Sequence, residues 1–195
     1  SQAVPNPGYL KLGKWGGTAD VQLAVTGASS TIHVVDVNPE GFDDLTPAGV
    51  GWKNNNWRVN AIEAADVDED GQSELYIAMD NSYVDGEGIQ RLTDLTSPTP
   101  SNTWVAGVNF GVLRMAFADI DGDSKLDLTV AERRSVGYGN EYRMRTVALP
   151  GRAPGADPFG DPVRLSVHDA YCPDRMDAGR MLPADMDHDG DLDLV

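Results

Sequence analysis

Carboxylates recur at alternate positions in short stretches of this chain. Segments 66–74, 119–127 and 185–193 begin with Asp and carry further acids at their third, fifth and ninth positions, and segment 36–44 follows the same spacing more loosely. Ca²⁺ takes about six to eight oxygens at roughly 2.3–2.6 Å. A chain curled tightly around an ion can supply side-chain oxygens from alternate residues together with one backbone carbonyl. The spacing therefore predicts calcium loops.

The expected ligands are the side-chain oxygens at positions 1, 3, 5 and 9 and the carbonyl oxygen at position 7. Position by position, they are Asp36, Asn38, Glu40, Phe42 and Asp44; Asp66, Asp68, Asp70, Gln72 and Glu74; Asp119, Asp121, Asp123, Lys125 and Asp127; and Asp185, Asp187, Asp189, Asp191 and Asp193. Glycine at position 6 permits the backbone reversal that a Cβ obstructs. Loop 119–127 has Ser124 there and Gly122 at position 4, so we expect its turn to differ slightly.

Three other interpretations of the acidic pattern compete with calcium loops between strands. An EF-hand needs a bidentate Glu at position 12 and a helix on either side, but position 12 holds Ile77 and Val130 and the flanks resemble strands. A plain acidic turn does not explain three near-identical copies. A carboxylate pair for glycoside hydrolysis is disfavoured because each of these acids already has a structural task.

Short apolar stretches flank the loops and predict strands rather than helices. They are rich in β-branched residues and bounded by Gly, Pro, Asn or Asp, whereas no window sustains a helical period. Four strands fit between loops 66–74 and 119–127, as in a propeller blade. The interval from 36 to 66 is too short for four, so either the first blade is abbreviated or segment 36–44 is a chance resemblance in a strand-to-strand turn. The expected strands are 75–79, 89–95, 103–108, 113–118, 142–148 and 163–167, with an irregular excursion over 150–162.

The pattern Asp-x-Asp-x-Asp-Gly-x-x-Asp-Leu between strands resembles the FG-GAP/VCBS repeat family, which includes the calcium-binding blades of integrin α-subunit propellers. The resemblance covers residues 32–195, although the Phe-Gly and Gly-Ala-Pro landmarks are mostly missing and the repeat spacing is uneven. It implies an all-β fold, a partial β-propeller of antiparallel four-stranded blades within a ring of about seven. Residues 1–195 would form one propeller region, with blades near 10–57, 58–110 and 111–178 and an incomplete blade at 179–195, completed by further blades from the same or other chains.

The net charge of −16 belongs to the loops and not to the surface at large. The four segments hold 18 of the 31 acidic residues, and the rest of the chain has a net charge of +1. This distribution argues against a nucleic-acid partner. No apolar run approaches the roughly 18 residues of a membrane span. The single cysteine, Cys172, cannot form a disulfide within the chain, and a start without Met fits either a processed secretory protein or a trimmed one.

Two function classes remain open. Weak calcium sites fill outside the cell and stay empty in the cytosol, so the sequence favours a secreted, extracellular or cell-surface protein, with the periplasm also compatible. The favoured role is a non-enzymatic module for binding, adhesion or assembly that holds three to four Ca²⁺ ions and takes a protein or glycan ligand. The alternative is a carbohydrate-active protein, either a propeller lectin or a polysaccharide lyase. Trp52 and Trp57 could stack on a sugar, although packing under a blade is the commoner role, and no catalytic residue is predicted.

Overall fold

The structure of this chain is a computed structural model. It describes residues 8–15, 21–26, 32–45, 58–80, 88–106, 108, 111–135, 142–152, 158–168, 183–184 and 193–194. Every regular element in these ranges is a β-strand. The described residues contain no helix suited to crossing a membrane.

The strands form three four-stranded antiparallel sheets and one short pair, each in chain order. The all-β class and the four-stranded antiparallel sheets are therefore confirmed. The first sheet contains β1 (Tyr9–Gly13), β2 (Gln22–Thr26), β3 (Ile32–Asn38) and β4 (Gly41–Asp44). The second contains β5 (Arg58–Ala65), β6 (Glu74–Asp80), β7 (Gly88–Thr93) and β8 (Ser101–Trp104). The third contains β9 (Gly111–Ala118), β10 (Asp127–Ser135), β11 (Tyr142–Leu149) and β12 (Val163–His168), and β13 (Pro183–Ala184) pairs with β14 (Asp193–Leu194).

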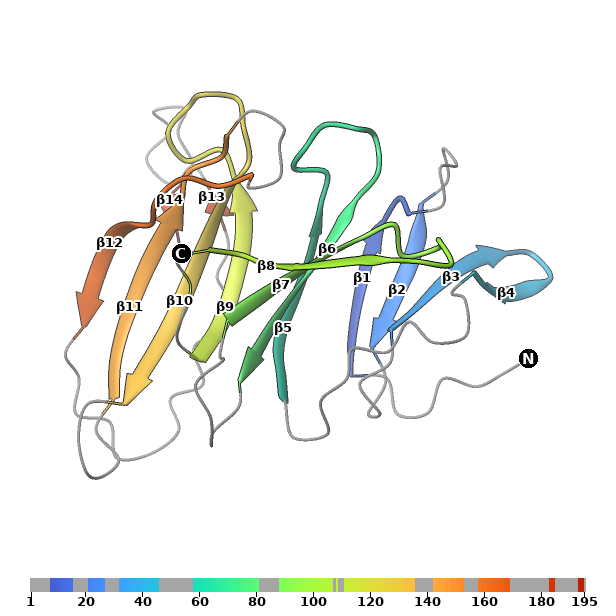
Figure 1. Cartoon of the computed structure of the whole chain (residues 1–195), viewed down its shortest axis with the longest axis horizontal. Coiled ribbons are helices and arrows are strands. Elements are labelled where there is room, and N and C mark those ends of the chain that lie inside the picture. The colour runs from blue at the N-terminus through green and yellow to red at the C-terminus, as the bar shows by residue number, and fades with distance from the viewer. Residues whose placement is uncertain are drawn as a thin grey trace.

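The sheets follow one another in space as they do in the chain (Figure 1), with the second sheet between the first and the third. Their leading strands are neighbours, since β5 contacts both β1 and β9. The Tyr9 hydroxyl donates to the carbonyl of Asn60 at 3.0 Å, and the Asn60 side-chain amide donates to the carbonyl of Val112 at 2.9 Å. Lys11 forms an ion pair of 2.7 Å with Glu63. Each leading strand is thus tied to the next one.

The middle sheet is apolar on both faces. Four consecutive residues of β6, Leu75 to Ala78, are fully buried at 0% exposure. Successive strand side chains point to opposite faces, so Tyr76 and Ala78 enter the core shared with the third sheet, while Leu75 and Ile77 enter the core shared with the first. A strand covered on both sides reads as a continuous apolar run. Burying each large apolar side chain contributes about 1.5–3 kcal/mol, so these faces hold the sheets together.

Four of the six expected strands lie within observed ones, and expected strand 89–95 runs two residues past the end of β7. Two further differences are instructive. Segment 103–108 enters β8 only as far as Trp104, after which Val105 and Val108 are buried in the core shared by the second and third sheets. Within the excursion 150–162, Gly151 and Phe159 form an isolated bridge. Phe159 is 2% exposed and packs edge-on against Tyr76 with ring centroids 5.9 Å apart, so this irregular segment supplies a core aromatic.

Candidate metal-binding loops

Loop 66–74 joins β5 to β6 and brings four carboxylates together. The strand pair Ala65 and Glu74 closes the loop, which fixes its two ends. Oxygens from Asp66, Asp68, Asp70 and Glu74 all lie within 4.8 Å of one another. These are the four side chains that the alternate spacing predicted as ligands.

Hydrogen bonds to the loop's own backbone hold it curled. The Asp66 carboxylate accepts from the backbone N–H groups of Asp70 and Gly71, both at 3.0 Å, and Asp70 accepts from the N–H of Gln72 at 2.8 Å. Glu69 and Gly71 have positive φ angles of 59° and 88°. The left-handed turns at these two residues direct the alternate carboxylates inward.

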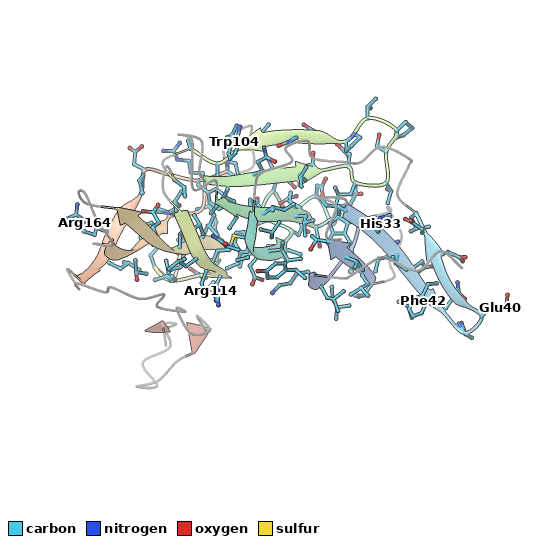
Figure 2. All side chains as sticks on the ribbon, turned by 90° about the horizontal axis from the view of Figure 1, so that it is seen from below. His33, Glu40, Phe42, Trp104, Arg114 and Arg164 are labelled. Carbon is cyan, nitrogen blue, oxygen red and sulfur yellow. The ribbon has the colours of Figure 1, made fainter. Side chains whose placement is uncertain are left out.

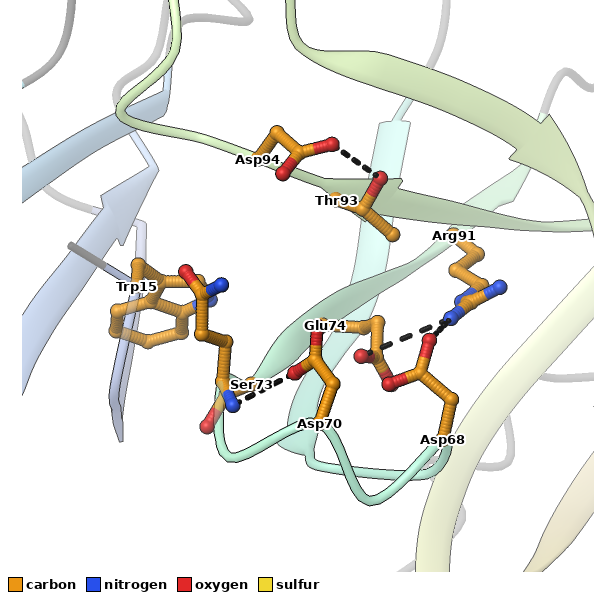
Figure 3. A pocket seen from close by; sticks show the side chains of 9 residues that line it. Trp15, Asp68, Asp70, Ser73, Glu74, Arg91, Thr93 and Asp94 are labelled. Atoms are coloured by element: carbon orange, nitrogen blue, oxygen red, sulfur yellow. Dashed lines mark hydrogen bonds and ion pairs between the residues drawn. The ribbon is translucent and has the colours of Figure 1, made fainter. Parts of the chain in front are cut away.

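Glu74 is the buried anchor of this group. It is 3% exposed, and its carboxylate accepts from the backbone N–H of Val67 at 2.9 Å. Burial raises the pKa of Glu74 to about 7, while that hydrogen bond and the Arg91 guanidinium act in the opposite direction. Arg91 Nη2 lies 3.6 Å from Glu74 Oε1 and 2.6 Å from Asp68 Oδ2 (Figure 3).

A cavity of about 180 Å³ lies beside loop 66–74, large enough for an ion with several waters. One buried oxygen of its lining, Asp68 Oδ1, has no hydrogen-bond partner in the protein. A buried acceptor is rarely left unpaired, so this atom fits a bound cation. The residues that line the cavity are Trp15, Asp68, Asp70, Gln72, Ser73, Glu74, Arg91, Thr93 and Asp94.

Loop 119–127 joins β9 to β10 in the same way, with Ala118 and Asp127 as its closing pair. Oxygens from Asp119, Asp121 and Asp127 lie within 4.8 Å of one another. Asp127 is 2% exposed and accepts from the backbone N–H of Ile120 at 2.8 Å, the counterpart of the bond from Val67 to Glu74. Each loop therefore has the same anchoring hydrogen bond, from the backbone N–H at position 2 to the carboxylate at position 9.

Asp123, at position 5, does not join this group of three. Its carboxylate pairs with the Lys125 ammonium and accepts from the Lys125 backbone N–H at 2.9 Å. These contacts lower the pKa of Asp123 and raise the pKa of Lys125. Both side chains are 37% exposed, so this pairing is screened by water and weak. The expected ligand Asp123 is therefore paired with Lys125 and does not converge with the other three carboxylates.

The turns of the two loops are more alike than the sequence suggested. Gly122 and Ser124 have φ angles of 77° and 68°, so positions 4 and 6 are left-handed in this loop just as in loop 66–74. The loops differ in the N–H groups at positions 4 and 5. In loop 119–127 these donate to Asp119 and Asp121 respectively, whereas in loop 66–74 the N–H at position 5 donates to Asp66. Glycine stands at position 6 in loop 66–74 and at position 4 in loop 119–127, and both loops are left-handed at both positions.

The first sheet contains a loop of the same length that the acidic pattern did not reveal. Gly13 pairs with Gln22, leaving eight residues between them, as in loops 66–74 and 119–127. Gln22 is 1% exposed, and its side-chain oxygen accepts from the backbone N–H of Trp15 at 2.9 Å. Position 1 of this loop is Lys14. Loop 14–22 thus has the same anchoring hydrogen bond, with a side-chain amide as the acceptor. The loop is recognised from the positions at which β1 ends and β2 begins, and not from acidic residues.

Segment 36–44 forms a hairpin between the third and fourth strands of the first sheet and not an ion loop. Asn38 pairs with Gly41, and Asp36 pairs with Asp43. A strand spaces alternate side chains about 7 Å apart, so the oxygens do not curl around a centre. Phe42 is 69% exposed near the tip of this projecting hairpin (Figure 2). Among the described residues, Asp36, Asn38, Glu40, Phe42 and Asp44 show no convergent group, which argues against the metal-site hypothesis for them.

The fourth loop is described only at its ends. Ala184 pairs with Asp193 and Pro183 with Leu194, again leaving eight residues between the closing pair. The expected ligands Asp185, Asp187, Asp189 and Asp191 lie outside the described residues, as do Trp52 and Trp57. The register at the strand ends nevertheless repeats that of the two carboxylate loops.

The ligand chemistry of the two complete loops is oxygen only. Carboxylates and backbone carbonyls are the ligands of hard cations such as Ca²⁺ and Mg²⁺, whereas Zn²⁺ sites favour His and Cys. The two groups could therefore hold a metal ion. Comparison of the chain with protein-family models and with curated proteins found no match.

Proposed function

We propose that this protein binds calcium in loops 66–74, 119–127 and 185–193 and that its sheets are successive blades of a β-propeller of the FG-GAP/VCBS type. The observation that carries the proposal is the convergence of Asp66, Asp68, Asp70 and Glu74 within 4.8 Å, together with the group of three in loop 119–127. Each of these two loops joins the first strand of a four-stranded sheet to the second.

Calcium suits these loops better than magnesium does. Mg²⁺ prefers a rigid octahedron at about 2.0–2.1 Å and keeps several of its waters, whereas Ca²⁺ accepts more ligands at longer and more variable distances. A flexible set of carboxylates with a carbonyl at Gln72 or Lys125 fits the second description. The partly exposed Asp68 and the exposed Asp70 leave room for one or two waters to complete the shell.

Packing of the sheets supports the propeller arrangement. Each sheet lies against the next, and the leading strands β1, β5 and β9 are neighbours, as blades are around a central axis. Three sheets do not close a ring, so further blades from the same or other chains would complete about seven. The pair β13 and β14 would begin the next blade beside β9.

Ion binding would tie the strands of each blade together in a calcium-rich medium. With a dissociation constant of about 10⁻⁴ M, as in other extracellular modules, about 1 mM Ca²⁺ stabilises each site by roughly 1.4 kcal/mol. This dependence favours a secreted or cell-surface module that serves binding, adhesion or assembly, with a protein or glycan as ligand.

Titration calorimetry on the 195-residue chain tests the proposal. We expect saturable Ca²⁺ binding that weakens when Asp68 or Asp121 is replaced by Asn, each substitution removing one site. The matched control is Asp43→Asn, in the hairpin, which should leave the binding unchanged. Absence of binding heat in the folded chain, at several temperatures, would refute the proposal.

A further inference from the structure

Arg91 places a positive charge against the cluster of four carboxylates in loop 66–74. It reaches the loop from β7 and is 8% exposed. Its Nη2 atom lies 2.6 Å from Asp68 Oδ2 and 3.6 Å from Glu74 Oε1. Two of the four carboxylates that an ion would need are therefore already in contact with a cation.

The third sheet has no guanidinium at the matching place. Arg91 pairs with Tyr76, two residues after the anchor Glu74, and the corresponding position two residues after Asp127 pairs with Ala148. The cation of loop 119–127 is Lys125, which is exposed and contacts an acid outside the convergent group. Of the two carboxylate loops that the structure describes in full, the buried guanidinium contact therefore occurs at loop 66–74 and not at loop 119–127.

The contact between Arg91 and Asp68 is incomplete. Arginine and a carboxylate often form two parallel hydrogen bonds, but here Arg91 Nε and Asp68 Oδ1 are both buried without a hydrogen-bond partner. Asp68 therefore keeps an oxygen for a second cation. Both residues line the cavity of about 180 Å³, which gives the guanidinium room to move away from the loop.

We propose that Arg91 is a resident counter-cation of loop 66–74, which Ca²⁺ displaces from Asp68 and Glu74 when it binds. This inference rests on the proposed calcium function of the loop. Like charges in contact with the same carboxylates repel, so the ion and the guanidinium compete for them. Arg91 stabilises the ion-free loop and lowers the affinity of this site, which sets the Ca²⁺ concentration at which the second sheet loads.

The test isolates loop 66–74 by titrating a parent chain that carries Asp121→Ala and Asp187→Ala. Arg91→Met and Arg91→Gln remove the charge, and Arg91→Lys retains it as the matched control. Calorimetry should show Ca²⁺ binding about tenfold tighter in both neutral variants than in the parent, because a hydrogen bond to a charged group is lost only from the ion-free state. The Lys variant should remain close to the parent. In chelator the neutral variants should melt at lower temperature, and saturating Ca²⁺ should restore them.

Equal or weaker binding in the neutral variants would overturn the role of Arg91, as would equal binding in the Lys and Met variants. Failure of both neutral variants to fold at saturating Ca²⁺ would also overturn it, since the ion would then not replace the guanidinium. These outcomes differ from failure of the proposed function. In that case the chain with no substitution binds no Ca²⁺ at all.

Discussion

Loops 66–74 and 14–22 occupy the same place in neighbouring sheets and differ in their acids. In both, a buried side chain at the first residue of the second strand accepts from the backbone N–H of the loop's second residue, Glu74 from Val67 and Gln22 from Trp15. The amide and the carboxylate accept this hydrogen bond at the same distance, 2.9 Å. The fold therefore requires the anchor bond but does not require acids at positions 1, 3 and 5. We assign these acids to ion binding.

The two loops also touch each other. The backbone N–H of Ser73 donates to the carbonyl of Lys14 at 2.6 Å, and the Ser73 hydroxyl accepts from the N–H of Lys14 at 3.0 Å. A loop without clustered acids thus abuts one with four. Ion binding in loop 66–74 would therefore also restrain loop 14–22 through these two hydrogen bonds.

Removal of calcium gives the largest expected contrast between the loops. Three loaded sites at about 1.4 kcal/mol each contribute roughly 4 kcal/mol in 1 mM Ca²⁺, and loop 14–22 contributes nothing to this difference. Scanning calorimetry in Ca²⁺ and in chelator should give melting temperatures that differ by about 8–16 °C. Identical melting curves would remove the distinction between the loops.

Loss of the amide anchor should destabilise the protein by about 1–3 kcal/mol whether or not calcium is present. Gln22→Ala leaves the N–H of Trp15, a residue 2% exposed, without its acceptor. Denaturant unfolding in chelator and in Ca²⁺ checks this. A loss that appears only with Ca²⁺ would mean that loop 14–22 also responds to the ion.

The charge on Glu74 should make the ion-free protein less stable as pH rises. Burial raises the pKa of Glu74 from 4.5 to about 7, so between these values the folded state binds more protons than the unfolded state and stability falls with increasing pH. Unfolding of the native chain and of Glu74→Gln, both in chelator, isolates this effect. We expect the native chain to lose about 1–3 kcal/mol relative to the variant between pH 5 and pH 8. Parallel pH profiles would contradict the assignment.

The smallest effect is expected at Lys125. Its ion pair with Asp123 is exposed and screened by water, so Lys125→Ala should leave the stability in chelator nearly unchanged. Because Asp123 is then free to turn towards the group of three, Ca²⁺ binding at loop 119–127 should tighten modestly. Weaker binding in this variant would show that Lys125 orders the loop rather than competing with the ion.

The spacing of acids along the sequence was enough to predict which side chains converge within a single loop. The alternate acids of loop 66–74 converge because a tight turn brings residues two apart to the same centre, and the sequence contains that information. Strands β6, β7, β9, β11 and β12 were likewise predicted from short apolar stretches bounded by turn residues, whereas no bounds were predicted for the strands of the first sheet.

What the sequence missed depends on contacts between distant strands. The approach of Arg91 to Asp68 follows from the register of β6 on β7, and the role of Gln22 follows from where β1 ends. Segment 36–44 has a similar acidic spacing, but β3 runs through Asn38 and pairs with β4, so extended backbone separates its oxygens. Composition alone does not distinguish a curled loop from a hairpin.

Diffraction from crystals grown in Ca²⁺, with anomalous data to identify the ion, decides whether these loops bind calcium. We expect one ion among Asp66, Asp68, Asp70 and Glu74, a second against Asp119, Asp121 and Asp127, a third in loop 185–193, and none in loop 14–22. Well-ordered carboxylate loops that hold only water at millimolar Ca²⁺ would contradict this expectation.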